Sequence, residues 1–212
     1  MNNLVYFAGV HGSGKSTLIK KLAEDDRLFY SYEKLEIPKD DRVVERNNIR
    51  LCRSYLQQFY QQQLAAEQTL TAQGKIVLCD RSWLDTAAYT RGFVDLGWMT
   101  TEHLQNERAL ERLLFNNTLP GKLIWVNPPY EWCHGNLKKR WAVGERKWRE
   151  EDERYHATVH QAYATMLQGE LGNAPEHMLV LTCTDLDQRV EQVRQFLGLS
   201  SRPVLAALQA AN

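Results

Sequence analysis

The chain has 212 residues, and its 26 lysines and arginines balance its 26 aspartates and glutamates, so its formal net charge at pH 7 is zero. Hydrophobic residues make up 43% and charged residues 25%, which is typical of a globular protein with a single α/β domain. A chain with no net charge is poorly suited to bind a long polyanion, so we do not expect long DNA or RNA as a partner.

The sequence gives no sign of export or membrane insertion. It has no apolar run of roughly 18 residues, and its start lacks the basic and apolar regions of a signal peptide. The four cysteines are far apart and form no Cys-x-x-Cys pair, which indicates reduced thiols and not a zinc site. We therefore expect a cytoplasmic protein with no membrane partner.

Short apolar segments alternate with longer amphipathic ones along the chain. The apolar segments, expected to be strands, are 4–10, 29–37, 75–79, 122–126 and 177–182. The amphipathic segments, expected to be helical, lie near 15–24, 43–73, 83–116, 130–168 and 186–198. This alternation predicts one domain over 1–212, built on a parallel sheet with helices on both faces, and its tail (200–212) has no assigned role. Ligands of such sheets bind beyond the carboxyl ends of the strands.

The first expected strand leads directly into a glycine-rich segment. Residues 9–16 have the sequence GVHGSGKS, which matches the pattern G-x-x-x-x-G-K-[ST] in full, and a helical pattern follows. The glycines let backbone N–H groups turn inward around an anion, and the helix N-terminus adds its positive end. The motif predicts that Lys15 reaches the β- and γ-phosphates of ATP and that Ser16 holds Mg²⁺.

The residues of this loop predicted to bind the nucleotide are Gly9, His11, Gly12, Ser13, Gly14, Lys15, Ser16 and Thr17. Of these, His11 carries the weakest argument, because an exposed loop histidine is the simpler interpretation. The alternative for the whole segment is an incidental glycine-rich turn. The strand–loop–helix context makes that alternative much less frequent.

The segment 29–37 ends in Glu36-Ile37-Pro38, at the carboxyl end of the second expected strand. A carboxylate there could orient an acceptor hydroxyl and take its proton, so Glu36 is a candidate catalytic and substrate-binding residue. The alternative is a solvated loop glutamate beside a turn-making proline. An acceptor that is already a phosphate would need no strong base.

The segment 43–73 carries a polar, cationic face. Five side chains recur at helical spacing within roughly 80° of arc, and they are Arg46, Arg50, Arg53, Gln57 and Gln61. One interpretation is a solvated helix face. The other is a wall of the substrate site, with Arg50 and Arg53 for a phosphate and Gln57 for the edge of a base.

The expected strand 75–79 ends in Asp80-Arg81. A carboxylate at position 80 can hold a Mg²⁺-bound water opposite the phosphate loop, and Arg81 is placed to bind a substrate phosphate or the moving phosphoryl group. The alternative is an ordinary strand-end turn with a surface ion pair. A complete phosphate loop elsewhere in the same chain favours the functional interpretation.

The segment 74–92, with the sequence GKIVLCDRSWLDTAAYTRG, resembles the Asp-Arg-Tyr region of thymidylate kinases. Ala88 and Tyr89 fall in the register of that family's Ala-Tyr-Gln, while Asp-Arg-Ser is similar to the Glu-Arg-Ser of deoxynucleoside kinases. The resemblance to this group implies a P-loop kinase fold, with five parallel strands in the order 2-3-1-4-5. It also implies ATP and Mg²⁺ as cofactors, a nucleoside or nucleotide acceptor contacted by Trp83 and Tyr89, and helices that pair in a homodimer.

The resemblance also bears on the two remaining candidate regions. Glu36-Ile37-Pro38 is similar to the Glu-Pro element of the group, in which deoxynucleoside kinases use the glutamate as the base. The basic segment 138–149, KKRWAVGERKWR, is similar to the group's arginine-bearing lid, which we place at about 138–150 with Gly144 as a flexible point. The candidate lid arginines are Arg140, Arg146 and Arg149. The alternative is a charge run that pairs along a helix.

Together these features predict an ATP-dependent kinase that acts on a nucleoside or a nucleoside monophosphate. A kinase for another small metabolite would have the same ATP-binding residues. A polynucleotide kinase acting on a nucleic-acid end or modified base is disfavoured by the zero net charge. A non-kinase nucleotide switch or ATPase module also remains, although Asn127-Pro128-Pro129 stands where a GTPase would carry Asn-Lys-x-Asp.

Overall fold

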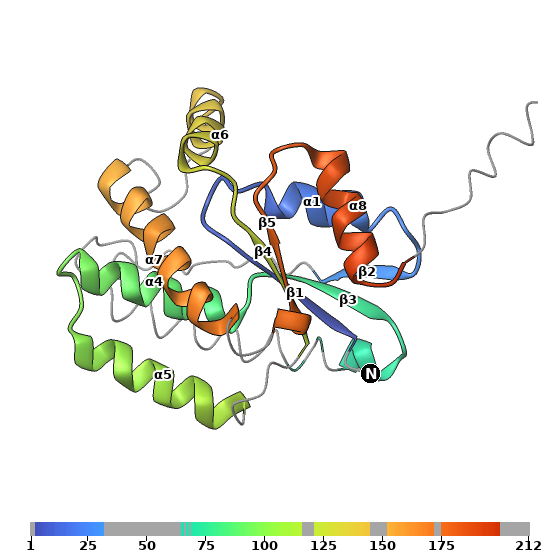
Figure 1. Ribbon diagram of the computed structural model, residues 1–212, viewed down its shortest axis with the longest axis horizontal. Coiled ribbons are helices and arrows are strands. Elements are labelled where there is room, and N and C mark those ends of the chain that lie inside the picture. Colours follow the sequence, from blue (N-terminus) through green and yellow to red (C-terminus); the bar gives the residue numbers. More distant parts are fainter. Residues whose placement is uncertain are drawn as a thin grey trace, which may run out of the picture.

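The computed structural model describes residues 3–31, 65, 67, 69–115, 121–144, 152–171 and 175–199. These residues contain one sheet, and its strands are β1 (Leu4–Ala8), β2 (Leu28–Ser31), β3 (Ile76–Asp80), β4 (Lys122–Val126) and β5 (Met178–Leu181). All neighbouring strands pair in parallel, in the order β2-β3-β1-β4-β5 (Figure 1). The predicted parallel sheet and the predicted order 2-3-1-4-5 are both confirmed.

Helices cover both faces of the sheet. They are α1 (Lys15–Leu22), α4 (Trp83–Asp95), α5 (Thr101–Phe115), α6 (Tyr130–Ala142), α7 (Glu153–Leu171) and α8 (Leu186–Phe196), with a 3-10 turn, η1 (Pro175–His177), before β5. Helices α1 and α8 lie on one side of the sheet, and α4 and α7 pack together on the other, with α5 outside α4 (Figure 1). Within the described ranges, none of the helices combines the length and apolar character that a membrane crossing requires.

Side-chain alternation along the strands produces two cores. In β1, Leu4, Tyr6 and Ala8 join the cluster under α4 and α7, whereas Val5 and Phe7 join the cluster under α1 and α8. Successive strand residues point to opposite faces, and here both faces are covered, so every position of β1 is buried. This arrangement explains the unbroken apolar run in the sequence.

Two of the amphipathic segments each contain two helices. The first divides at Gly97, which has a φ of 73° and follows the end of α4; the next amide, that of Trp98, donates to the carbonyl oxygen of Phe93. The second divides after α6, where Gly144 has a φ of 82°. Left-handed backbone at a glycine is a common helix stop. The first division separates α4 from α5, and α7, which follows the second, packs against α4.

The buried carboxylate of Asp25 links the two helices on the other face. It lies in the turn between α1 and β2, and it accepts hydrogen bonds from Arg27 Nη2 at 2.7 Å and from Arg194 Nη2 of α8 at 2.6 Å. Its side chain is 1% exposed. The hydrogen bonds from Arg27 and the charge of Arg194 hold the pKa of Asp25 well below its ordinary range. The ion pair therefore fixes the C-terminal end of α1 to α8.

We predict that Asp25→Asn lowers the melting temperature at pH 7 by roughly 3–10 °C, because two guanidinium groups lose their carboxylate. The lowered pKa means that the charge of Asp25 stabilises the fold above about pH 4 and loses this effect as the pH falls through the native pKa. The difference between variant and wild type in urea unfolding should thus begin to shrink below about pH 4 and shrink further as the pH falls toward the native pKa. An exposed carboxylate on the same turn, Glu24, provides the control variant Glu24→Gln, which should differ little from wild type.

Candidate functional site

The segment after β1 turns through three glycines with positive φ, namely 146° at Gly9, 79° at Gly12 and 85° at Gly14. Residues other than glycine rarely adopt these backbone conformations. Space is also limited, because a Cβ atom at Gly12 would collide with the carbonyl oxygen of Cys133. Helix α1 begins immediately after the turn at Lys15, so its free N–H groups face the loop. This is the geometry of an anion-binding cradle.

Lys15 supplies a buried cation to this cradle. Its side chain folds back over the loop, where Nζ donates to the carbonyl oxygens of Gly9 and Val10 and lies 3.4 Å from Ser13 Oγ. Burial, followed by the nearby charge of Arg81, lowers the pKa of Lys15 to about 8. Lys15 is therefore mostly protonated at pH 7, and a bound anion would favour that charged form further.

The two predicted magnesium ligands meet at the edge of the sheet. Ser16, on the first turn of α1, donates its hydroxyl to Asp80 Oδ2 at 2.6 Å, and Asp80 is the last residue of β3. The hydroxyl of Tyr30 lies 3.3 Å from the same oxygen. Hydroxyl and carboxylate oxygens suit Mg²⁺. Among the described residues no group of three or more His, Cys, Asp or Glu could hold a metal, so this ion would need water and phosphate ligands as well.

Arg81 follows Asp80 in a left-handed conformation, with a φ of 93°. Such a backbone costs a non-glycine residue on the order of 1–3 kcal/mol, which the surrounding contacts must offset. The amide of Arg81 donates to the carbonyl oxygen of Phe7 at 3.0 Å. Its guanidinium lies 5.3 Å over the ring of Tyr89, and Nη2 is 3.4 Å from His11 Nδ1. The strained backbone thus directs the guanidinium toward the phosphate loop.

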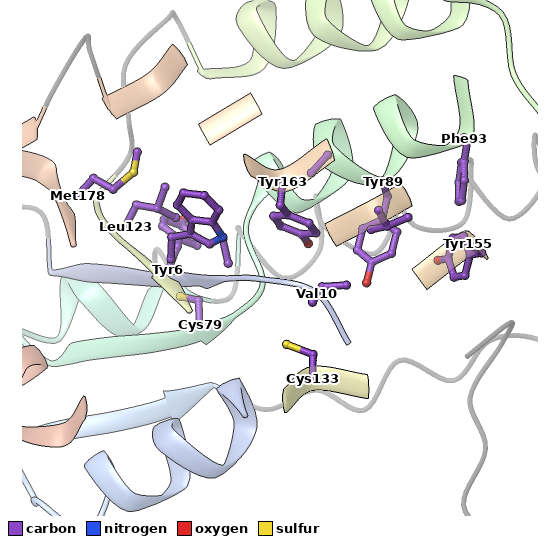
Figure 2. Packing of buried hydrophobic residues seen from close by; sticks show 14 of the residues in the cluster. Tyr6, Val10, Cys79, Tyr89, Phe93, Leu123, Cys133, Tyr155, Tyr163 and Met178 are labelled. Atoms are coloured by element: carbon purple, nitrogen blue, oxygen red, sulfur yellow. The ribbon is translucent and has the colours of Figure 1, made fainter. Parts of the chain in front are cut away.

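Tyr89, a predicted substrate contact, is only 8% exposed. Its ring packs at 5.8 Å from Tyr163 and 6.4 Å from Phe93, within the cluster shown in Figure 2. It also makes an edge-on contact with the ring of His11, at 5.5 Å between centroids, and lies beneath the guanidinium of Arg81. Tyr89 does not line the cavity described next, so its substrate role stays a prediction.

A single cavity of about 430 Å³ brings most of the candidate residues together. It is lined by His11, Gly12, Ser13, Gly14, Lys15, Ser16, Thr17, Asp80, Arg81, Trp132, Asn136, Arg140, Thr184, Leu186 and Arg189. The loop, the strand-end pair and one lid arginine, which lie in three distant parts of the sequence, therefore face one space. Their identity as site residues remains a proposal, but their proximity agrees with the sequence analysis.

The far wall of this cavity contains residues that the sequence analysis missed. Asn136 of α6 donates to the carbonyl oxygen of Gly12 at 2.9 Å, and Arg189 of α8 donates to that of Ser13 at 3.0 Å. The guanidinium of Arg189 lies 4.8 Å from the ring of Trp132. Both helices follow strands that end at this edge of the sheet, so the rule that ligands bind at carboxyl ends was the signal available for them.

Histidines on α7 also contact this region through the backbone. His156 Nε2 donates to the carbonyl oxygen of His11 at 2.9 Å, and His160 Nε2 donates to that of Pro128 at 3.2 Å. Burial lowers the pKa of His156 to about 4, so the ring is neutral near pH 7. The contact links α7, which follows the expected lid in the chain, to the phosphate loop.

The basic segment predicted as a lid is described only in part. Arg140 lies on the last turn of α6 and lines the cavity, and the helix ends just before Gly144. Arg146 and Arg149 lie outside the described residues, as do the acceptor-side candidates Glu36, Arg50, Arg53 and Gln57. Trp83 begins α4, but its side chain also lies outside the described part of the structure.

Comparison with known proteins agrees with the fold. A family model described as an AAA domain matches residues 4–189. A solved structure of deoxyadenosine kinase from M. mycoides with bound dATP is 17% identical, covers 92% of this chain and 99% of that chain, and has a TM-score of 0.73. A second, with bound dCTP, is 16% identical over 92% and 98% of the two chains, with a TM-score of 0.66. These likenesses confirm the predicted P-loop kinase fold, while no curated protein matched the chain.

We predict that the affinity for ATP falls as the pH rises above 8. The charge of Lys15 is present below its pKa of about 8 and is lost above it, whereas the terminal phosphate is already ionised above about pH 6. The dissociation constant should therefore rise between pH 7 and pH 9.5, by at most about tenfold per pH unit. Calorimetric titration at several pH values measures this, and an affinity that does not change over the range contradicts the assigned contact.

Proposed function

We propose that this chain, which belongs to the AAA domain family, transfers the γ-phosphoryl group of ATP to a nucleoside or a nucleoside monophosphate. The observation that carries the proposal is the single cavity in which the phosphate loop, Lys15, the Ser16–Asp80 pair, Arg81 and Arg140 all face one space. The similar deoxyadenosine kinase structures hold dATP or dCTP, which supports a nucleotide as the ligand here.

The arrangement suits phosphoryl transfer because that reaction needs positioning and fixed positive charge more than covalent chemistry. In its loose transition state, negative charge spreads over the equatorial oxygens of the moving group. The loop N–H groups and Lys15 would hold the donor phosphates, while Arg81 and Arg140 approach from two other elements. Charges fixed in advance in a partly enclosed site stabilise that state at no cost in reorganisation.

Magnesium fits the same site. When bound, Mg²⁺ neutralises charge on the β- and γ-phosphate oxygens. Ser16 and Asp80 would hold it, and the 2.6 Å hydrogen bond between them already places the two oxygens on the same side of the cavity. Asp80 is oriented by Tyr30 as well as by Ser16.

The far wall suits the base of the donor nucleotide. Trp132 and Arg189 present a planar ring and a planar guanidinium beside Gly14, and Asn136 and Thr184 add polar groups. Pockets for flat ligands combine apolar surface with a few placed polar groups in this way. We therefore place the donor base on this wall and the acceptor on the side of Arg81.

The proposed acceptor is supported by the resemblance noted in the sequence and by the ligands of similar structures. A third M. mycoides deoxyadenosine kinase structure, 17% identical with a TM-score of 0.67, holds the products dCMP and dCDP. We propose that Glu36, Arg50, Arg53 and Gln57 contribute the acceptor side, in a cytoplasmic homodimer. The alternatives are a different small metabolite, a nucleic-acid end or modified base, or a nucleotide switch without an acceptor.

One experiment separates these alternatives. The protein is incubated with ATP, Mg²⁺ and a panel of nucleosides, nucleoside monophosphates, short oligonucleotides and other metabolites, and mass spectrometry identifies which compound gains a phosphate. We expect transfer to a nucleoside or nucleoside monophosphate, and a loss of at least about 100-fold in Lys15→Ala. Lys20→Ala, an exposed change on the same helix, is the control. Transfer to another class, or to none, overturns the proposed function.

A second prediction concerns Arg81. We expect Arg81→Ala to lower the rate of transfer to the acceptor by roughly 100-fold or more, because the cation that would hold the acceptor beside the moving group is lost. Hydrolysis of ATP by water, which makes no use of the acceptor, should fall less. Arg91→Ala removes an arginine from the surface of α4, where Arg91 pairs with Asp95, and serves as the matched control. An equal fall in the rates of transfer and hydrolysis would contradict the proposed contact between Arg81 and the acceptor.

A further inference from the structure

A completely buried carboxylate stands behind the wall of the cavity. Asp85 is the third residue of α4 and is 0% exposed. Its Oδ2 accepts hydrogen bonds from the amide of Ser82 at 2.6 Å and from the Ser82 hydroxyl at 2.9 Å. The first of these contacts, together with the bond from the Asp85 amide to the Ser82 side chain, forms a capping box, which is visible in the sequence as Ser-x-x-Asp before a helical segment. The helix cap accounts for the hydrogen bonds of only one of the two carboxylate oxygens, Oδ2.

The other oxygen has partners far away in the sequence. Asp85 Oδ1 accepts from the amide of Gly9 at 3.3 Å and from the hydroxyl of Tyr163 at 2.6 Å, residues that lie 76 and 78 positions away. Burial raises the pKa of Tyr163 well above its usual value, so this hydroxyl keeps its proton and donates. One carboxylate thus joins the start of the phosphate loop, the N-terminus of α4 and the middle of α7.

The same oxygen faces the cation of the site. Arg81 Nη1 lies 3.7 Å from Asp85 Oδ1, and the Arg81 side chain is 26% exposed, so it reaches from the buried carboxylate to the cavity. The backbone of Arg81 is left-handed, and contacts around the residue must maintain that conformation. Asp85 is a charged contact on the protein side of the guanidinium, opposite the space that a phosphate would occupy.

We propose that Asp85 is a positioning residue that holds Gly9 and Arg81 in one fixed geometry from behind the cavity wall. It does not line the cavity and touches no substrate. Its effect on rate rests on the proposed phosphoryl transfer, because stabilisation of a transition state depends on donors held within a fraction of an ångström. Its effect on the loop is independent of the reaction.

The kinetic test compares two variants of the same cap. Asp85→Asn keeps the size of the side chain but removes its charge; we expect kcat to fall by about 10- to 100-fold, with the KM for ATP changed by less than about threefold. Ser82→Ala removes the cap hydroxyl but keeps the carboxylate, and we expect a lower melting temperature with kcat within about twofold of wild type. A normal kcat in Asp85→Asn, or an equal loss of kcat in Ser82→Ala, would show that Asp85 acts only as a helix cap and would overturn the proposal.

A second measurement needs no acceptor. Amide hydrogen exchange is followed in the free protein, and we expect at least about tenfold faster exchange over residues 9–16 in Asp85→Asn, with β4 unchanged. Exchange that rises equally in β4 would show general destabilisation and overturn the proposal. If wild type transfers phosphate to no acceptor, the proposed function fails, while the exchange result still decides the role of Asp85.

A third variant covers the case in which Asp85→Asn does not fold. Tyr163→Phe removes one donor from the carboxylate without removing its charge. We expect the same pattern at smaller amplitude, with faster exchange over residues 9–16 and a kcat lowered about two- to tenfold. Unchanged exchange and unchanged kcat in Tyr163→Phe would contradict the role of the carboxylate as the link between α7 and the loop.

Discussion

The turn between β1 and α1 sets the constraint on which the site depends. The backbone must pass from an extended strand to a helix while its N–H groups face inward, and it does so through left-handed conformations at Gly9, Gly12 and Gly14. Such a loop has few side chains of its own with which to hold its shape. Its carbonyl oxygens accept hydrogen bonds from Lys15 at its own end and from three side chains of other helices, Asn136, His156 and Arg189. The rest of the fold serves to deliver these donors.

The parallel sheet explains how these donors come to lie beside the phosphate loop. Because all the strands run in parallel, their carboxyl ends meet at one edge, and α1, α4, α6 and α8 each start there after β1, β3, β4 and β5. Two separate cores pack the helix layers against the sheet, with many aromatic residues on the α4–α7 side and mainly aliphatic residues on the α1–α8 side. A buried carboxylate and a buried arginine, Asp85 and Arg189, carry contacts from those layers into the loop.

Local sequence patterns predicted the parts of the protein that depend on neighbours in the chain. The motif at 9–16 specified its own conformation, and the apolar runs located the five strands of the described sheet, because a strand covered on both faces is apolar at nearly every position. Lys15, Ser16, Asp80 and Arg81 follow from those two signals, and the structure places them together. The sequence could not show that Asn136 and Arg189 reach the loop, since such contacts depend on the packing of helices that are distant in the chain. Asp85 had a local signature as a helix cap, but its bond to Gly9 could not be inferred from that signature.

Helix α8, the last described helix, contacts the chain on both sides of the first helix, α1. Arg189 of α8 binds the backbone just before α1, at Ser13, and Arg194 binds Asp25 just after it. The first 25 residues contain the phosphate-loop motif, yet they complete their contacts only with residues that are synthesised some 170 positions later. A nascent chain therefore cannot make these two contacts until α8 has left the ribosome. A chain cut short before α8 would lack both the hydrogen bond from Arg189 to Ser13 and the ion pair between Arg194 and Asp25.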